Sequence, residues 1–426
     1  MNVISRQCLL LAVLIAGPCG SLLAEENWPM WRGPRGDGTS LQQKIPTAWS
    51  GTENIAWKVA IPGQGHASPI VWQDRVFLVT CLEDGQRLLL CLDRNDGTEL
   101  WRKTVFTAEL ENHHQLNSRA SSTPATDGEL VYVSFLEPDG TKKLFKDERY
   151  ITPGRMVVAA YDLEGNLHWK VRPGEFASIH GYCSPPVIWE DRLLVNGDHD
   201  GDSYLLALDK ETGETIWKTQ RENKTRSYST PIIREIDGRT QMILSGNMCV
   251  ASYDPADGSR HWIVDGPTEQ FVASVVYNGE LIFMTCGFPD KLMQAIRPDG
   301  KGNVTDTHVV WESRESASYV PSPVAVGDYF LLVADNGIAS QYKASTGKRI
   351  WRERLGGGHS ASLITAGGLV YFTSDTGTTT VVRPGEKFDL VAKNELGERV
   401  SASPAVSQGQ LFLRGFEHLY CIGEKE

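Results

Sequence analysis

Short hydrophobic runs, each followed by a tight polar turn, recur along almost the whole chain. In one unit the run Tyr204-Leu-Leu-Ala-Leu208 leads into the turn Asp209-Lys-Glu-Thr-Gly213, and Thr215-Ile-Trp217 follows it. Glycine tolerates the positive φ of such a turn because it has no Cβ atom that could clash. Each unit therefore predicts a β-hairpin whose second strand carries a tryptophan.

The tryptophans of these hairpins return at intervals of 40 to 49 residues, with one interval of 68. They are Trp57, Trp101, Trp169, Trp217, Trp262, Trp311 and Trp351. Five of them have a glycine four residues ahead, namely Gly97, Gly165, Gly213, Gly258 and Gly347. Large aromatic residues that recur so evenly are typical of a core between repeated units, so we predict a structural role for them.

A second signal follows 11 to 21 residues after each tryptophan and consists of small residues that lead into a β-strand. Its eight starts lie at Ser68, Ser122, Ser184, Ser229, Ser274, Ser322, Ser362 and Ser403. A polar turn and another apolar run come next, as in Asp74-Arg75 before Val76-Phe-Leu-Val79. Each unit thus contains four short strands.

A period near 45 residues with four strands per period is typical of a β-propeller blade. We predict an all-β, eight-bladed β-propeller of four-stranded antiparallel blades over residues 51–426, with a degenerate eighth outer strand near Phe388-Asp-Leu390. The last unit ends at Leu419-Tyr-Cys-Ile422 without a tryptophan strand, and Asn54–Val59 has no unit before it. We expect this N-terminal strand to complete the C-terminal blade, which leaves no open sheet edge there.

The first residues predict export from the cytoplasm. A short apolar run from Cys8 to Ala16 precedes small residues and the polar Glu25-Glu26, which predicts a signal peptide over residues 1–24. Pro18 does not suit lipidation at Cys19, so we expect a periplasmic or secreted protein without a lipid anchor. Residues 25–50, rich in Gly and Pro, are expected to form a tail packed on the propeller.

Composition narrows the classes of partner and site. The net charge of −11, without a Lys/Arg cluster, argues against nucleic acid and anionic lipid surfaces. Six cysteines remain after the signal peptide and show no CxxC spacing, so we predict neither a zinc site nor a compact disulfide framework, although a single pairing stays open.

The unit Ala207-Leu-Asp209-Lys-Glu-Thr212-Gly213-Glu-Thr-Ile-Trp217 resembles the quinoprotein (PQQ-like) β-propeller repeat, Ala-x-Asp-x-x-Thr-Gly-x-x-x-Trp, at every position. The resemblance covers about residues 51–426 and implies that the tryptophans dock between blades. One branch of that family contains dehydrogenases that use pyrroloquinoline quinone (PQQ) with calcium. Another contains non-catalytic exported propellers, including the lipoprotein of the outer-membrane β-barrel assembly machinery.

Differences from the dehydrogenase branch favour the non-catalytic branch of the family. That branch has a vicinal Cys-Cys pair over its cofactor, and no two cysteines are adjacent here. Its calcium ligands and catalytic aspartate cannot be placed on matching positions. We therefore predict no cofactor, no metal and no catalytic set, and interpret the chain as a monomeric, non-catalytic binding or scaffolding module for an exported or outer-membrane protein partner. The alternative is a PQQ-dependent periplasmic dehydrogenase; a hydrolase or lyase is a third, weaker hypothesis.

Polar and aromatic residues just before the small-residue starts are the candidates for a ligand site at one channel mouth. They are His66, Arg119, His180, Tyr182, Arg226, Tyr228, Tyr319 and His359. Their side chains suit a polar or anionic ligand in a locally basic ring. The alternative is that they satisfy backbone groups around a water-filled channel. A metal site of three of these histidines has no short-range ligand spacing to support it. An insertion in blade two, residues 137–155, is expected to be a charged, solvated loop.

Overall fold

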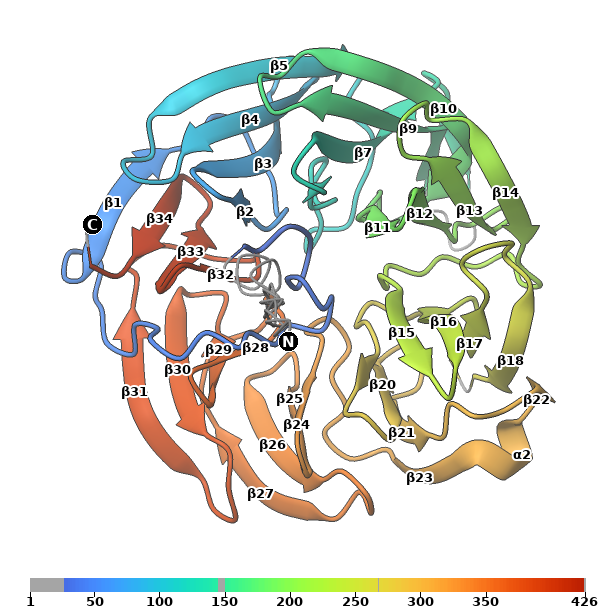
Figure 1. Ribbon diagram of the computed structural model, residues 1–426, viewed down its shortest axis with the longest axis vertical. Coiled ribbons are helices and arrows are strands. Elements are labelled where there is room, and N and C mark those ends of the chain that lie inside the picture. Colours follow the sequence, from blue (N-terminus) through green and yellow to red (C-terminus); the bar gives the residue numbers. More distant parts are fainter. Residues whose placement is uncertain (1–26, 145–149, 267, 425–426) are drawn as a thin grey trace, which may run out of the picture.

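The protein is an eight-bladed β-propeller, with eight separate antiparallel sheets arranged around a central axis (Figure 1). The computed structural model describes residues 27–144, 150–266 and 268–424, so the predicted signal peptide over residues 1–24 lies outside the described residues. Both the all-β class and the number of blades predicted from the sequence are confirmed.

Blades one to four follow the chain in order, each with its inner strand first. Their strands are β2 (Ile70–Trp72), β3 (Arg75–Cys81), β4 (Gln86–Asp93) and β5 (Glu99–Thr107); β6 (Ala125–Thr126), β7 (Leu130–Pro138), β9 (Tyr150–Asp162) and β10 (Leu167–Ser178); β11 (Val187–Trp189), β12 (Arg192–Gly197), β13 (Tyr204–Asp209) and β14 (Thr215–Gln220); and β15 (Ile232–Ile236), β16 (Arg239–Gly246), β17 (Cys249–Tyr253) and β18 (Arg260–Asp265).

Blades five to eight repeat the pattern. Their strands are β19 (Val276–Tyr277), β20 (Ile282–Cys286), β21 (Leu292–Ile296) and β23 (Val309–Ser313); β24 (Val324–Val326), β25 (Tyr329–Val333), β26 (Ile338–Lys343) and β27 (Arg349–Arg354); β28 (Ile364–Ala366), β29 (Leu369–Thr373), β30 (Thr378–Arg383) and β31 (Asp389–Glu395); and β32 (Ala405–Ser407), β33 (Gln410–Arg414), β34 (His418–Ile422) and β1 (Ile55–Ala60). Short additions are β8 (Lys143–Leu144) beside β9, β22 (Gly302–Asn303) beside β18, and the helix α2 (Thr305–His308).

The ring closes through the first strand of the chain, as the sequence predicts. β1 is the outer strand of blade eight and pairs antiparallel with β34, from Ile55 opposite Ile422 to Ala60 opposite His418. The degenerate outer strand predicted near residue 388 is also present, as β31 of blade seven. Phe388, just before it, packs edge-on against Trp351 at a ring distance of 5.2 Å.

Most of the repeated tryptophans join one blade to the next. The indole nitrogen of Trp57 donates to Arg94 O of blade one at 2.7 Å, and that of Trp169 donates to Lys210 O of blade three at 3.0 Å. Trp101, Trp217 and Trp311 make the same kind of bond to the following blade. Trp262 instead donates within its own blade, and Trp351 Nε1 has no hydrogen-bond partner among the described residues.

Glycine is required in the turns because the tryptophan of the preceding blade lies directly against them. At Gly213, φ is +75° and an added Cβ would lie 2.6 Å from a ring carbon of Trp169. Gly97 meets Trp57 in the same way at the closing junction, where the distance would be 2.8 Å. The Gly and Trp signals of the sequence therefore belong to one contact between successive blades.

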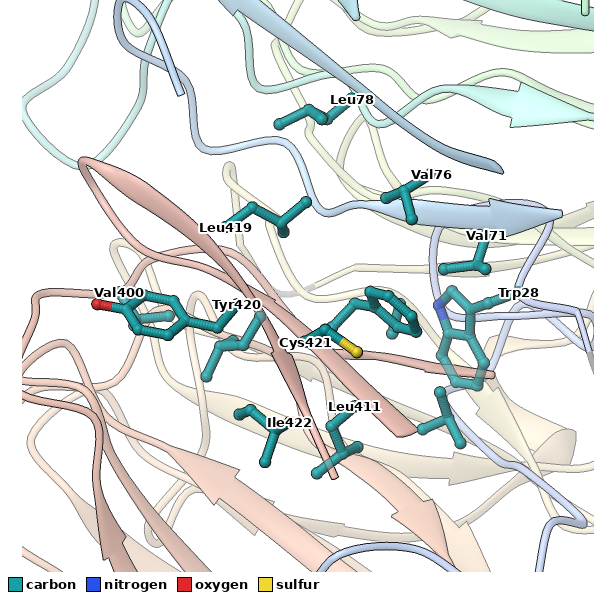
Figure 2. Packing of buried hydrophobic residues seen from close by; sticks show 14 of the residues in the cluster. Trp28, Val71, Val76, Leu78, Val400, Leu411, Leu419, Tyr420, Cys421 and Ile422 are labelled. Carbon is teal, nitrogen blue, oxygen red and sulfur yellow. The ribbon is translucent and has the colours of Figure 1, made fainter. Parts of the chain in front are cut away.

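Residues 27–49, which we call the strap, run across one mouth of the channel before the chain reaches β1 (Figure 1). Trp28 exchanges two backbone hydrogen bonds with Val71 of blade one, and Gln42 O accepts from Gly367 N of blade seven. Trp28 is fully buried beside Val71 and in one cluster with β34 residues of the closing sheet (Figure 2). The strap thus ties the closing sheet to the blades on either side of it.

A buried arginine fixes the middle of the strap. The Arg32 guanidinium donates to Asp37 O at 2.6 Å and to the carbonyls of Pro323 and Leu363, which precede the inner strands of blades six and seven. Asp37 in turn accepts from Arg234 of blade four at 2.6 Å. Because the strap contacts opposite sides of the ring, it spans this mouth of the channel.

Cysteines and the blade-two insertion complete the fold. No disulfide joins any two of the six cysteines in the described residues, and five of these cysteines are buried. In the insertion, β7 and β9 stay paired out to Pro138 opposite Gly154, so part of the expected loop is an extended hairpin; residues 145–149 lie outside the described part. Among the described residues, no helix is long and apolar enough to cross a bilayer.

Candidate functional site

Two stacked layers of side chains, one pair from each blade, form the inner wall of the channel. Residues two apart on an extended chain point to the same side, so each lead-in to an inner strand can place two side chains in the lumen. In blade one these residues are Ser68 in the lower layer and His66 in the upper layer. The lower layer lies nearer the strap, and the upper layer nearer the opposite mouth.

The lower layer is a ring of hydroxyl groups linked around the axis. A backbone N–H of one blade donates to a hydroxyl of the next blade at 2.7 to 3.0 Å. The donor and acceptor pairs are Ser68 to Thr123, Thr230 to Ser274, Ser274 to Ser322, Ser322 to Ser362, Ser362 to Ser403, and Ser403 to Ser68. Six of the eight blade junctions are therefore joined by this one repeated bond.

Blade three interrupts the hydroxyl ring. Pro185 occupies the ring position and has neither a hydroxyl nor a backbone N–H. As a result Thr230 of the next blade receives no bond from blade three, and its Oγ1 has no hydrogen-bond partner among the described residues. Thr230 lines the channel, but its Oγ1 is itself buried, so the gap leaves one polar atom without a partner behind the wall.

The channel contains a cavity of about 320 Å³ whose floor includes Trp31 of the strap. Its outer wall includes Leu116, from the connection between blades one and two, and Phe288, from the hairpin between β20 and β21. These two side chains are 48% and 51% exposed, so the cavity reaches the surface at the mouth opposite the strap.

The upper layer divides the cavity into a polar and an apolar half. Adjacent blades seven, eight, one and two contribute Ser360, Ser401, His66 and Ser121. Blades three to six contribute Cys183, Tyr228, Val272 and Val320. A ligand in this cavity would therefore meet hydrogen-bonding groups on one side and mainly apolar surface on the other.

No charged side chain lies in the described cavity wall, because its residues are aromatic, aliphatic, hydroxyl, thiol, amide and histidine groups. Burial, together with the nearby Arg414, lowers the pKa of His66 to about 4, so its ring is neutral at pH 7. His66 Nδ1 has no hydrogen-bond partner among the described residues. Since an unpaired charge is costly to bury, this wall favours an uncharged ligand.

Four of the eight predicted rim residues line the cavity. They are His66, His180, Tyr228 and Tyr319. The hydroxyl of Tyr319 donates to Gln270 Oε1 at 2.7 Å, and the ring of His180 lies 6.0 Å from that of Tyr228. These contacts fix the aromatic rings at the mouth.

The other four predicted residues lie behind the wall. Arg226 pairs with Asp200 at 2.6 Å and is buried, and Arg119 donates to Glu111 O at 2.9 Å. Tyr182 belongs to the hydrophobic cluster between blades two and three, and His359 is buried. Asp200 thus neutralises Arg226, whereas Arg119 shares Glu111 with the buried Arg87. Because neither arginine lines the described cavity, its wall lacks the locally basic ring that the sequence suggested.

The alternation of side chains along an extended chain would have identified the residues of the cavity wall more accurately than their chemical character did. Counting two residues back from each ring position identifies the upper layer and adds Ser121, Ser360 and Ser401 to the predicted residues. Trp31 could not be found in this way, because the strap reaches the cavity only through the closure of the ring.

The donor groups of the cavity do not fit PQQ with calcium. Calcium takes six to eight oxygen ligands, largely carboxylates and carbonyls, and no carboxylate lines the described cavity. Across residues 27–144, 150–266 and 268–424, no group of three or more His, Cys, Asp or Glu side chains could hold a metal ion. His66, His180 and His359 therefore do not form the metal site considered from the sequence.

The chain is similar in sequence to one family of known proteins. The family model described as outer membrane protein assembly factor BamB matches residues 47–142, 143–276 and 302–387, well over half of the chain. The outer membrane protein assembly factor BamB of Burkholderia pseudomallei (strain K96243) is 31% identical over 113 residues. That match covers 26% of this chain and 29% of the Burkholderia protein, less than a third of either.

Solved structures share the fold at low sequence identity. BamB from Moraxella catarrhalis superposes with a TM-score of 0.55 at 11% identity, over 86% of this chain and 97% of that one. A europium-containing methanol dehydrogenase superposes with a TM-score of 0.52 at 12% identity, over 94% of this chain and 98% of that one. At these sequence identities, the two structures support only a shared propeller fold.

Proposed function

This chain belongs to the family of the outer membrane protein assembly factor BamB, and from that premise we propose that it is an exported, non-catalytic β-propeller whose open channel mouth is a binding site. One observation carries the proposal: a single cavity wall, built by all eight blades, is spanned by the strap at one end and open at the other. Propellers commonly bind where loops of several blades converge on the channel.

The chemistry of the wall supports binding rather than turnover. No carboxylate lines the described cavity to act there as a general base. Asp375, which bonds the hydroxyl of Ser360, lies behind the wall. The buried carboxylates nearby, such as Asp200 and Asp198, are committed to Arg226 and Arg221. A site of this kind selects and holds a ligand or a partner.

A protein partner in the cell envelope is part of the proposal. The Burkholderia relative is named as an outer membrane protein assembly factor, and the predicted signal peptide would deliver this chain to the same compartment. At the open mouth, Leu116, Phe288 and Phe416 are exposed apolar side chains on three different connections. Exposed apolar side chains around a cavity suit a partner that covers them.

Site-specific photo-crosslinking in cells that make the full chain tests the binding face. A photoreactive residue at Leu116, at the open mouth, is expected to yield adducts with an exported or outer-membrane protein, identified by mass spectrometry. The matched control is Leu41 in the strap, which is 58% exposed on the side that the strap spans. Equal labelling at both positions, or none at Leu116, would contradict the proposal.

Two further measurements test export and the absence of catalysis. N-terminal sequencing of the mature protein is expected to begin near Glu25, and an intact Met1 would refute export. Adding PQQ and calcium to the purified protein is expected to give neither a bound chromophore nor dye-coupled alcohol oxidation. Clear turnover would instead establish the dehydrogenase alternative.

A further inference from the structure

We propose that the cavity binds an uncharged ligand with hydroxyl groups along one edge and an apolar face on the other, the chemistry of a neutral sugar ring. This inference rests on the proposed binding site at the open mouth and adds the class of ligand. It follows from four properties of the wall: its lack of charge, its two halves, its hydroxyl ring and its size.

Charge is the first restriction on the ligand. An anionic ligand would need a cation in the wall, yet no lysine or arginine lines the described cavity. Behind the wall, Arg226 is paired with Asp200, Arg119 shares Glu111 with Arg87, and Arg414 donates to the backbone carbonyls of Ala67 and Val79. His66 is neutral at pH 7 because burial lowers its pKa to about 4. A charged group entering this described wall would lose its hydration without gaining a counter-charge.

The division of the upper layer is the second restriction. Ser360, Ser401, His66 and Ser121 lie side by side on four adjacent blades and present hydrogen-bonding groups. The facing blades present Val272, Val320 and the ring of Tyr228, whose hydroxyl is already bonded to Ser178 at 2.8 Å. Tyr319 and Gln270 also line this side, and the Tyr319 hydroxyl donates to Gln270 Oε1 at 2.7 Å. A flat ligand with one polar edge and one apolar face would match both halves.

The hydroxyl ring is the third restriction, because it calls for a ligand that both donates and accepts. Each ring hydroxyl that accepts a backbone N–H keeps its own proton for an acceptor. Thr230 Oγ1 has no partner among the described residues, and rotation about its Cα–Cβ bond exchanges the hydroxyl and methyl groups at the wall. A ligand hydroxyl can serve both needs, whereas a bare anion cannot donate.

Size is the fourth restriction. The cavity volume of about 320 Å³ lies at the small end of ligand sites in proteins, which span about 300 to 1,000 Å³. One sugar ring, or a terminal unit of a longer glycan that leaves through the mouth, fits that volume. The indole of Trp31 at the floor adds an aromatic surface for an apolar ring face.

Isothermal titration calorimetry with the full mature chain tests the inference. The probes are D-glucose, D-mannose, N-acetyl-D-glucosamine and maltose, with glucose 6-phosphate as the charged analogue of the first. At least one neutral sugar is expected to bind saturably. Glucose 6-phosphate is expected to bind about tenfold more weakly than glucose, because its phosphate would be buried without a counter-charge.

Three variants locate the binding. Thr230→Val should weaken sugar binding by about tenfold while leaving the melting temperature unchanged or higher, because it removes a polar group that has no partner. Ser360→Ala should also weaken binding by about tenfold. Ser345→Ala, the matched control, removes an exposed hydroxyl from the turn between β26 and β27 and should leave binding unchanged.

The outcomes separate this inference from the function on which it rests. If no neutral sugar binds, or if Thr230→Val and Ser360→Ala leave binding intact, the inference is wrong. Tighter binding of the phosphate ester would overturn the uncharged class while keeping a ligand site at the mouth. Specific crosslinks at Leu116 without sugar binding would retain the proposed function alone, and failure of both experiments would remove both.

Discussion

Replacing Trp57 by alanine should weaken the closure of the ring more than it weakens any other junction. Trp57 is carried by β1, the strand that the N-terminus contributes to the last blade, and its side chain is only 8% exposed. Its indole N–H donates to Arg94 O of blade one, and Gly97 of the same blade lies against its ring. The substitution therefore loosens β1 from blade one at the place where the two ends of the chain meet.

The expected cost is about 4 kcal/mol, since Trp→Ala changes in a core typically cost 3–5 kcal/mol. A matched control is available in Trp169→Ala, because Trp169 is also 8% exposed, donates to Lys210 O and has Gly213 against its ring. The two variants should lose similar free energies of unfolding in urea. Only Trp57→Ala lies on a strand that can detach without unfolding a whole blade.

Native-state hydrogen exchange distinguishes the two losses. In Trp57→Ala, the backbone amides of β1 and β34 should exchange about a thousandfold faster than in the unmodified protein, the equivalent of about 4 kcal/mol in opening free energy. In Trp169→Ala, the amides of β10 should exchange faster, and the amides of β1 and β34 should be accelerated far less than in Trp57→Ala. Equal acceleration of β1 in both variants would refute the argument that β1 is the locking strand.

Three further predictions follow from buried groups. Burial lowers the pKa of His359 to about 4 from its ordinary value of 6.5, so the unfolded state binds more protons between these two pH values. The contribution of His359 to the free energy of unfolding should therefore fall by about 3 kcal/mol as the pH drops from 6.5 to 4. His359→Gln should flatten this pH dependence in urea titrations. Arg226→Ala should destabilise the protein by about 3–5 kcal/mol in the same assay, because it leaves Asp200 buried without its partner at 2.6 Å; a small loss would argue that water reaches the carboxylate. Gly213→Ala should lower the melting temperature more than Gly238→Ala, since both glycines have positive φ but only the first would place a Cβ against a tryptophan.

The fold could be predicted from the sequence because its signals are local and repeated. A glycine turn, a tryptophan strand and a serine-led strand lie within one blade, and the contact between Gly213 and Trp169 recurs at five junctions. Even the closure was predictable, because a strand without a unit and a unit without its last strand are both visible in the sequence. Trp262 shows the limit, since its indole bond stays within its own blade despite an ordinary repeat pattern.

The site could be predicted only in part because its chemistry depends on contacts between blades. The sequence places Arg226 before an inner strand but does not show that Asp200, on a hairpin of the previous blade, neutralises it. Tyr182 and Tyr228 differ by one position relative to their strand starts, and that single step turns the first into the core and the second toward the cavity. Both tyrosines were predicted as rim residues from their aromatic and polar character alone.

The pairing of β1 with β34 also determines how the molecule would respond to a pull on its two ends. Ile55 and Ile422, opposite each other, are the points where the chain enters and leaves the same antiparallel pair, so tension between the termini would peel its hydrogen bonds one after another. The strap lies upstream of that weak point and is held by Arg32 and by Asn394, which bonds to Thr47 and Trp49. Tension arriving from the N-terminal side would meet this anchorage first, so a chain tethered by that end could bear load without unzipping its ring.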